Sequence, residues 1–302
     1  MWIVSSDITG QRLRGALNIE MAKSWCMVSE TQNTEQARMA SGIDWANLAA
    51  TAISQPDKIC ITARNQITLL ADLRTRFVRR QGFTLATINL DHVVKIAHDT
   101  AFRRAYATHS HVTADGRPIA WLSRLAGVPV GLIPGSELVE PVAELAAELG
   151  VPVALMGSTE PALGRAGAAL EERYPQLQIV VRIAPPMGFD ALGPDGQTCI
   201  DQLATSGARL CFLALGAPKQ ELFAARAAEA LPETGLLSIG AGLDFLSGDQ
   251  TRAPGIIRKL ALEWRWRLLG NPRRMFGRYM ACFGILPRAT VAALRARYIA
   301  RG

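Results

Sequence analysis

Short apolar runs recur along the chain, and each ends in a turn that contains glycine or polar residues. These runs cover residues 83–88, 151–157, 177–183, 208–216 and 235–242. Segments with helical spacing of apolar residues lie between them, at 92–107, 160–174 and 218–231. Strands that alternate with helices favour βαβ units, whose right-handed crossovers place helices on both faces of a parallel sheet. We therefore predict an α/β fold with a mostly parallel sheet.

The rest of the chain divides around this region. Residues 1–42 are polar with weak periodicity, and we predict a poorly ordered N-terminal extension that carries no signal peptide. Residues 43–250 form the predicted α/β domain, and residues 251–302 form a basic helical appendage. No run reaches the roughly 18 apolar residues that a membrane-spanning helix needs.

Charge is distributed unevenly along the sequence. The formal net charge is +7, yet residues 251–302 alone hold twelve Arg or Lys and a single acid, Glu263. The stretch 263–279 contains five arginines and four aromatic residues. A basic segment of this kind usually meets an anionic partner. Nucleic acid, a membrane surface and a phosphate-containing substrate are the three candidates.

The appendage has a helical pattern. Apolar residues at Ile256, Leu260, Trp264 and Leu268 fall on one helix face. Asn271 and Pro272 suit the N-cap and first position of a second helix. We predict a third helix over residues 287–300.

Residues that could bind a ligand follow the predicted strands. Turns with exposed backbone N–H groups and helix N-termini suit a diphosphate. The candidates are Thr87, Asn89, Gly157, Gly216, Pro218, Lys219, Gln220, Glu221, Gly242 and Asp244. Each is also explained by ordinary turn chemistry, since no complete Walker A loop or G-x-G-x-x-G fingerprint is present.

Asp115 is the carboxylate most suited to chemistry. It precedes Gly116 at a predicted strand-to-helix turn, where an Asp commonly caps a helix or supports the turn. The alternative role is a general base that takes a proton from an attacking hydroxyl. The four histidines show no metal-ligand spacing with carboxylates, and we predict that they are solvated or cap helices. The five cysteines are scattered, which is typical of reduced structural thiols.

Four segments, 87–125, 216–221, 240–254 and 262–279, occur in a characteristic order and at characteristic distances. They contain T-I-N and D-G, then G-A-P-K-Q-E, then G-A-G-L-D-F, and finally E-W-R-W-R and N-P-R-R. Together they resemble the WecG/TagA/CpsF family of bacterial glycosyltransferases.

The resemblance implies a Rossmann-like catalytic domain and a helical appendage that meets the membrane. Relatives transfer a sugar, with inversion, from a UDP-sugar to an undecaprenyl-diphosphate-linked saccharide during exopolysaccharide and other cell-envelope biosynthesis. This chain would then be a cytoplasmic transferase, peripheral on the inner face of the cytoplasmic membrane. Its donor would supply N-acetylmannosamine, glucose or galactose. The donor sugar, the acceptor saccharide and homo-oligomer formation stay open.

The resemblance also implies roles for single residues. Asp115 would be the catalytic base, Thr87 and Asn89 would line the acceptor and donor pocket, and Gln220 would lie near the sugar and diphosphate. The diphosphate would be bound by appendage arginines, which fall on Arg267, Arg274 and Arg278. The chain departs from the family pattern at Asn271, where an acid is frequent, and at Gly277, where a basic residue is frequent.

No D-x-D motif is present to hold a metal ion. Arginine is always charged and pairs with phosphate through two hydrogen bonds. Arginines can therefore neutralise a leaving diphosphate, and we expect a metal-independent enzyme without a cofactor.

Two other classes of protein compete with this interpretation. A nucleic-acid-binding protein would use the basic segment, but no named nucleic-acid motif is present, and Trp264 and Trp266 lie in an amphipathic pattern typical of an interfacial helix. A nucleotide-dependent oxidoreductase would require the glycine fingerprint and ribose-binding acid that the sequence lacks. We therefore expect anionic membrane lipid, and no nucleic acid, among the partners.

Overall fold

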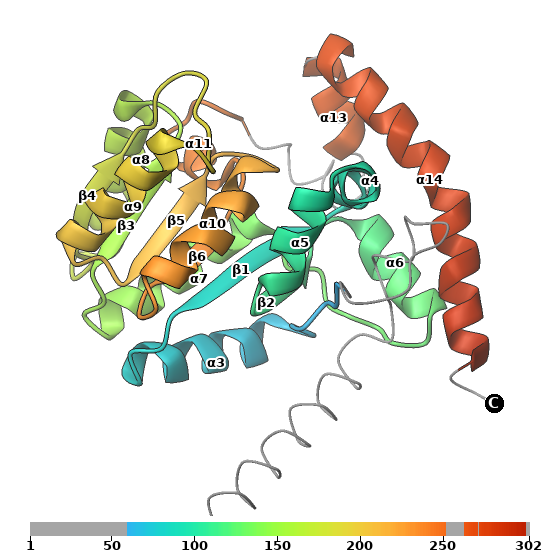
Figure 1. Cartoon of the computed structure of the whole chain (residues 1–302), viewed down its shortest axis with the longest axis horizontal. Coiled ribbons are helices and arrows are strands. Elements are labelled where there is room, and N and C mark those ends of the chain that lie inside the picture. Colours follow the sequence, from blue (N-terminus) through green and yellow to red (C-terminus); the bar gives the residue numbers. More distant parts are fainter. Residues whose placement is uncertain (1–58, 252–262, 271, 300–302) are drawn as a thin grey trace, which may run out of the picture. The chain divides into compact units, whose positions relative to one another are not determined.

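The computed structural model describes residues 59–251, 263–270 and 272–299 (Figure 1). The predicted extension 1–42 and the start of the appendage at 252–262 lie outside these ranges. All the described residues belong to one compact unit.

A six-stranded sheet forms the centre of the described fold, and every pair of neighbouring strands is parallel. The order across the sheet is β2-β1-β6-β5-β3-β4. The strands are β1 Phe83–Ile88, β2 His111–Ala114, β3 Val153–Gly157, β4 Ile179–Ile183, β5 Leu210–Ala214 and β6 Gly235–Ser238. The predicted α/β fold with a parallel sheet is confirmed.

Helices cover both faces of this sheet, because side chains alternate along each strand. Leu85 belongs to a core layer with α3 Gln66–Val78, α7 Gly135–Glu148, α8 Glu160–Arg173 and α11 Gly242–Leu246. The neighbouring Ala86 belongs to the opposite layer. That side is covered by α4 Leu90–His98, α5 Thr100–Thr108, α6 Arg117–Leu125, α9 Pro194–Ser206 and α10 Lys219–Ala230.

The predicted helical segment 92–107 is divided into α4 and α5. Asp99 lies between them in an extended conformation, and its side chain accepts a hydrogen bond from the backbone N–H of Phe102. Asp99 thus caps α5, and local capping ends one helix and begins the next.

The appendage contains α13 Glu263–Gly270 and α14 Pro272–Ile299. The predicted helix start at Pro272 is confirmed, but the prediction of a separate third helix is wrong, because α14 continues through Pro287. Cys282 before this proline and Ala289 after it are both buried. Contacts with α4 and α6 hold both parts of α14 in one line, so tertiary packing outweighs the helix-breaking tendency of proline.

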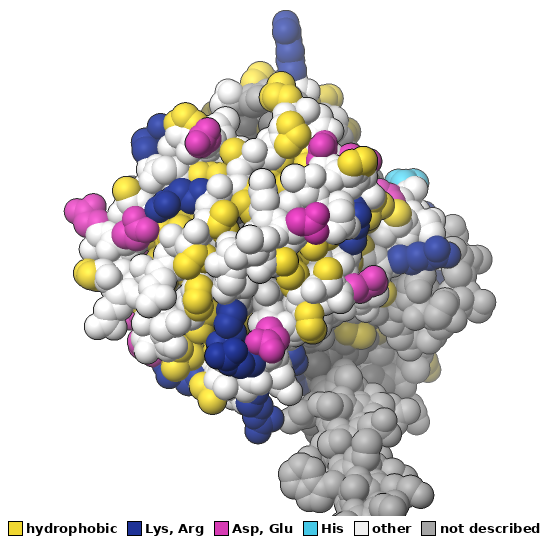
Figure 2. Space-filling view, turned by 60° about the vertical axis from the view of Figure 1, so that its left-hand side comes forward, with side chains coloured by type: hydrophobic (Ala, Val, Ile, Leu, Met, Phe, Trp, Pro, Cys, Tyr) yellow, Lys and Arg dark blue, Asp and Glu magenta, His cyan; other side chains and the backbone are white. Residues whose placement is uncertain are grey.

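Figure 2 shows one face of the molecule, on which basic and acidic side chains are interspersed with apolar ones. This mixture is ordinary for a soluble α/β domain. It differs from the described part of the appendage, whose charged residues beyond Glu263 are all arginines.

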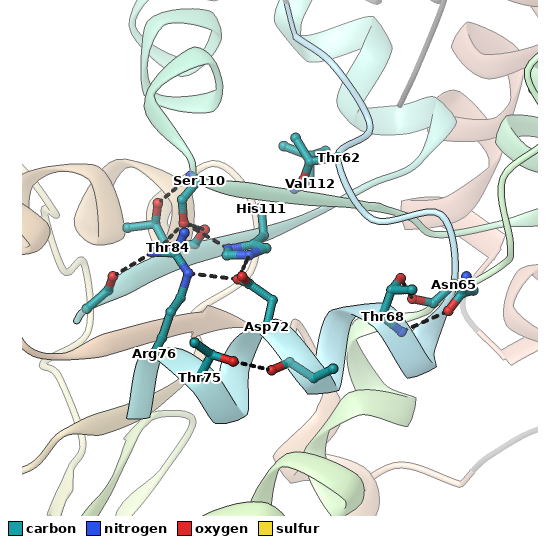
Figure 3. A network of polar contacts seen from close by, with 12 residues as sticks. Thr62, Asn65, Thr68, Asp72, Thr75, Arg76, Thr84, Ser110, His111 and Val112 are labelled. Atoms are coloured by element: carbon teal, nitrogen blue, oxygen red, sulfur yellow. Dashed lines mark hydrogen bonds and ion pairs between the residues drawn. The ribbon is translucent and has the colours of Figure 1, made fainter. Parts of the chain in front are cut away.

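A polar network attaches α3 to the amino end of β2 (Figure 3). Asp72 accepts hydrogen bonds from Arg76 Nε and His111 Nε2, each at 2.8 Å. On the other side of the ring, His111 Nδ1 lies 2.9 Å from Ser110 Oγ. Ser110 Oγ also donates to the carbonyl oxygen of Thr84 at 2.9 Å. The two ring nitrogens of His111 thus connect Asp72 of α3 with Ser110, the residue before β2.

Replacing Asp72 by Asn retains the shape of the side chain and removes its charge. We expect the free energy of unfolding to fall by about 1 kcal/mol at neutral pH, a value that allows for the half-exposed position of Asp72. Urea denaturation measures this change. Glu172→Gln, an exposed substitution on α8, is the control and should have little effect.

The effect of Asp72→Asn should depend on pH. The hydrogen bond from His111, with a smaller effect of Arg76, lowers the pKa of Asp72 from 3.8 to about 2. The carboxylate of Asp72 therefore stabilises the folded protein above about pH 4, and this stabilisation is lost as the pH falls toward 2. The difference in free energy of unfolding between wild type and Asp72→Asn should shrink over the same pH range. Equal stability of the two proteins at neutral pH would contradict this role of Asp72.

Candidate active site

The strands β1 and β6 are neighbours, but the chain leaves them toward opposite faces of the sheet. After β1 it enters α4 on one face, and after β6 it enters α11 on the other. Open α/β sheets bind ligands at such a point, beyond the carboxyl ends of the strands. The predicted ligand-binding residues follow β1, β2, β3, β5 and β6, and parallel pairing brings all these strand ends to one edge.

Asn89 and Asp115 come together at this edge. The backbone N–H of Asp115 donates to the carbonyl oxygen of Ile88 at 2.8 Å, directly before Asn89. Asn89 caps α4 by accepting from the N–H of His92. Gly116 has φ of 95°, and a Cβ placed on it would lie 4.0 Å from Asn89 Cβ. The structure thus places the predicted base beside a predicted pocket residue, on a turn whose backbone favours glycine.

Thr87 occupies a deeper position in β1. Its side chain is buried, and its Cγ2 atom would be 3.2 Å from a Cβ on Gly135, at the start of α7. Its carbonyl oxygen accepts a hydrogen bond from the hydroxyl of Tyr106. Thr87 therefore packs against the start of α7 and anchors Tyr106 close to the carboxyl end of β1. Its contact with substrate stays a prediction.

Gln220 and Glu221 begin α10 and are both buried. Gln220 Oε1 accepts from the backbone N–H of Gly240 at 3.1 Å, and its Nε2 donates to Glu221 Oε1 at 2.8 Å. The loops after β5 and β6 are therefore joined by one side chain. Lys219 is exposed at the same helix start, after the cis peptide bond of Pro218.

The turn after β3 is joined to α11. Ser158 Oγ donates to Asp244 Oδ1 at 2.7 Å, and Gln250 Nε2 donates to Asp244 Oδ2 at 2.8 Å. Gly157 and Gly242 have packing reasons to be glycine: added Cβ atoms would lie 2.4 Å and 2.9 Å from neighbouring atoms of other segments. Gly216 has a φ of 71°, a backbone conformation that favours glycine. Substrate contacts of these residues stay predictions.

The sequence analysis did not predict a row of buried, hydrogen-bonded polar groups close to the carboxyl end of β1. His92 Nδ1 lies 2.8 Å from the hydroxyl of Tyr106, which donates to the Thr87 carbonyl oxygen at the same distance. Burial lowers the pKa of His92 to about 3, so the ring is neutral and donates through Nδ1. The prediction of solvated or capping histidines is wrong for His92 and His111, which are buried. It holds for His109, whose ring contacts the carbonyl oxygen of Ala105 in the last turn of α5.

The appendage reaches this region through Arg278. Its guanidinium forms an ion pair with Asp91 of α4 at 3.0 Å, and Asp91 is only 12% exposed. Lys95 Nζ also lies 3.0 Å from Asp91 and donates to the carbonyl oxygen of Ala217, in the loop after β5. Asp91 and Lys95 were missed because nothing in their local sequence distinguishes them from solvated charges of a helix. Arg267 and Arg274 lie in α13 and α14, and their side chains are outside the described structure.

Within residues 59–251, 263–270 and 272–299, no three His, Cys, Asp or Glu side chains group in a way that could hold a metal ion. In the same part of the chain, no helix is both long and apolar enough to cross a bilayer.

A parallel sheet with a carboxylate, capped helix N-termini and glycine turns at its carboxyl edge defines a Rossmann-like α/β enzyme. The family model for the glycosyl transferase WecG/TagA/CpsF family matches residues 58–299. The chain belongs to this family. It is therefore a glycosyltransferase of this type, which acts in cell-surface glycan synthesis.

Replacing Asp91 by Ala should loosen the attachment of α14, because Arg278 and Lys95 lose their shared counter-ion. We expect faster amide hydrogen exchange in α14 around Arg278, measured by mass spectrometry. A double-mutant cycle of Asp91→Ala with Arg278→Ala should give a coupling energy of about 1 kcal/mol.

Arg288→Ala is the matched control, since Arg288 is an exposed arginine of the same helix. It should leave exchange around Arg278 unchanged. Exchange in Asp91→Ala equal to that of wild type, with zero coupling energy, would show that the ion pair does not hold α14.

Proposed function

We propose that the protein is an inverting glycosyltransferase that uses a UDP-sugar and a polyprenyl-diphosphate-linked saccharide as substrates. The position of Asp115 beside Asn89, at the carboxyl edge of the sheet in a member of this family, carries the proposal. A carboxylate at this place suits a reaction whose nucleophile is a hydroxyl group.

In the proposed reaction, the acceptor hydroxyl oxygen forms a bond to the anomeric carbon of the donor sugar. The bond between that carbon and the β-phosphate oxygen breaks, and UDP leaves with the electron pair. Asp115 takes the hydroxyl proton as the new bond forms. Base catalysis of this kind typically contributes a factor of about 10²–10⁴ to the rate.

Arginines of the appendage suit the leaving diphosphate. Negative charge grows on the β-phosphate as the bond breaks, and a fixed cation stabilises it most in the transition state. We assign this role to Arg267 and Arg274. Arg278 is the third candidate, and its ion pair with Asp91 holds it close to α4, next to the turn that contains Asn89. This mechanism needs no metal ion.

The appendage also suits an anionic membrane surface. Trp266, Phe276 and Met280 are exposed large apolar residues of α13 and α14, and arginines lie among them. Trp264 packs against Tyr279 and Phe283, which joins the two helices. Aromatic residues interleaved with arginines are typical of interfacial helices drawn to anionic lipid. We infer a peripheral location on the cytoplasmic face of the membrane.

Asp115→Asn tests the catalytic assignment. We expect UDP release in the presence of a polyprenyl-diphosphate-linked acceptor to fall by about 10²–10⁴, because an amide cannot take the proton. Binding of UDP should change little. A panel of UDP-sugars identifies the donor in the same assay.

Asp201→Asn, on the exposed side of α9, is the control and should retain wild-type turnover. Wild-type turnover by Asp115→Asn would remove Asp115 as the base. Failure of every UDP-sugar to give UDP release, with an intact fold, would refute the proposed donor class.

Cosedimentation with vesicles tests the membrane assignment. The double variant Trp266→Ser/Phe276→Ser should bind vesicles with anionic lipid at least about tenfold more weakly than wild type, since full insertion of one large apolar side chain contributes about 1.5–3 kcal/mol. Trp121→Ser, which removes an exposed tryptophan of α6, is the control. Equal partitioning of the double variant and wild type would contradict insertion of this surface.

A further inference from the structure

Glu221 is a buried acid for which the proposed reaction has no chemical step. It lies in the first turn of α10, and its side chain is fully buried. Its Oε1 atom accepts a hydrogen bond from Gln220. Its Oε2 atom makes no hydrogen bond within the described residues. Burial of a carboxyl group with one oxygen lacking a hydrogen bond costs folding free energy. This cost indicates that Glu221 has a role in the protein.

Glu221 acts on the loops of the edge through Gln220. The amide of Gln220 joins Glu221 Oε1 on one side to the backbone N–H of Gly240 on the other. Its own backbone N–H donates to the carbonyl oxygen of Gly216. The acceptor Glu221 at the Nε2 end and the donor Gly240 at the Oε1 end together fix which way the amide of Gln220 points. The turn at Gly240 depends on that orientation.

We propose that Glu221 is a positioning residue: through Gln220 it holds together the loops after β5 and β6, where the anionic part of the nucleotide sugar binds. This inference rests on the proposed function, and it predicts that Glu221 never touches the substrate. It differs from the direct contact expected from the sequence motif.

The charge state of Glu221 follows from its surroundings. Burial raises its pKa from 4.5 to about 7, and the hydrogen bond from Gln220 and the charge of Lys95 oppose this rise only in part. Tyr106 of α5 interacts electrostatically with Glu221 and also with Asp115. The neighbouring strands β1 and β6 contain no titratable side chains. A substantial fraction of Glu221 is therefore uncharged at neutral pH.

Ionisation of Glu221 should weaken donor binding. A carboxylate buried at this edge repels an anionic diphosphate, and the repulsion is strong because little solvent screens it. This repulsion acts on binding of the donor, whereas proton transfer to Asp115 acts on turnover.

The pH dependence of KM and kcat separates these roles. For wild type we expect KM of the UDP-sugar to rise about tenfold between about pH 6 and about pH 8, as Glu221 ionises. Glu221→Gln keeps the acceptor for Gln220 and stays uncharged. Its KM at about pH 8 should therefore lie near the wild-type value at about pH 6. Glu229→Gln, an exposed position of the same helix, should retain the wild-type rise.

A second measurement does not depend on activity. Between about pH 4.5 and about pH 7 the folded protein keeps a proton on Glu221 that the unfolded chain releases, so stability falls as the pH rises through this window. Glu221→Gln does not lose stability in this way. Its melting temperature minus that of wild type should therefore increase by about 5 °C from about pH 4.5 to about pH 7. Exchange of the Gly240 amide proton should be faster in Glu221→Ala and unchanged in Glu221→Gln.

The outcomes distinguish the two proposals. A wild-type KM that does not change with pH, or the same rise in Glu221→Gln, overturns the role of Glu221. If no UDP-sugar is used but the stability and exchange results appear, the proposed function fails and the structural link through Gln220 stands. If Glu221→Ala does not fold, the comparison of Glu221→Gln with wild type decides the matter.

Discussion

In the parallel pairs β1–β2, β1–β6 and β5–β6, the carboxyl ends of the strands lie at one edge of the sheet. This pairing, together with the parallel pair β3–β5, gives the turns after five strands a common location, although the turns after β1 and β6 are more than a hundred residues apart in the sequence. The dipoles and free N–H groups of the following helices then point to the same region. Asp115 and Asn89 owe their proximity to this constraint, and so does the bond by which Gln220 joins the loops after β5 and β6.

Buried charge connects that edge to the rest of the molecule. Asp91 binds Arg278 of α14 and Lys95 of α4, and Lys95 reaches the loop after β5. The position of the appendage is thus linked to the loops of the candidate site. Asp91 is only 12% exposed, so removal of its cationic partners would leave a largely buried carboxylate unpaired.

Five of the six described strands were predictable because their apolar runs are short, bounded by turns and separated by helical segments; the four-residue strand β2 was not among the predicted runs. Prediction failed where local and tertiary effects disagree. The continuity of α14 through Pro287 depends on contacts with α4 and α6, and no sequence window contains those contacts. The break at Asp99 depends on a single cap. Four segments shared with the family were sufficient to recognise the class of enzyme.

The candidate site divides in the same way. Asp115, Asn89 and Gln220 were found from turn chemistry and family motifs, since these signals are local. Burial then changed the interpretation of several residues: Glu221 is enclosed, and Asp244 is occupied by Ser158 and Gln250. The burial of a side chain and its hydrogen-bond partners depend on segments that are distant in the sequence. The local motif that contains a residue therefore does not predict them.

The sequence by itself determined the parallel α/β class, the family, and the basic, aromatic character of the appendage. Each of these follows from local sequence pattern and composition. Tertiary structure alone decided that His92 is neutral, that Arg278 binds Asp91, and that Glu221 is buried with one carboxyl oxygen lacking a hydrogen bond from the described residues. The physical reason is that solvation and charge pairing depend on the distances between elements. Folding sets those distances only when β1, β6, α10 and α14 pack together.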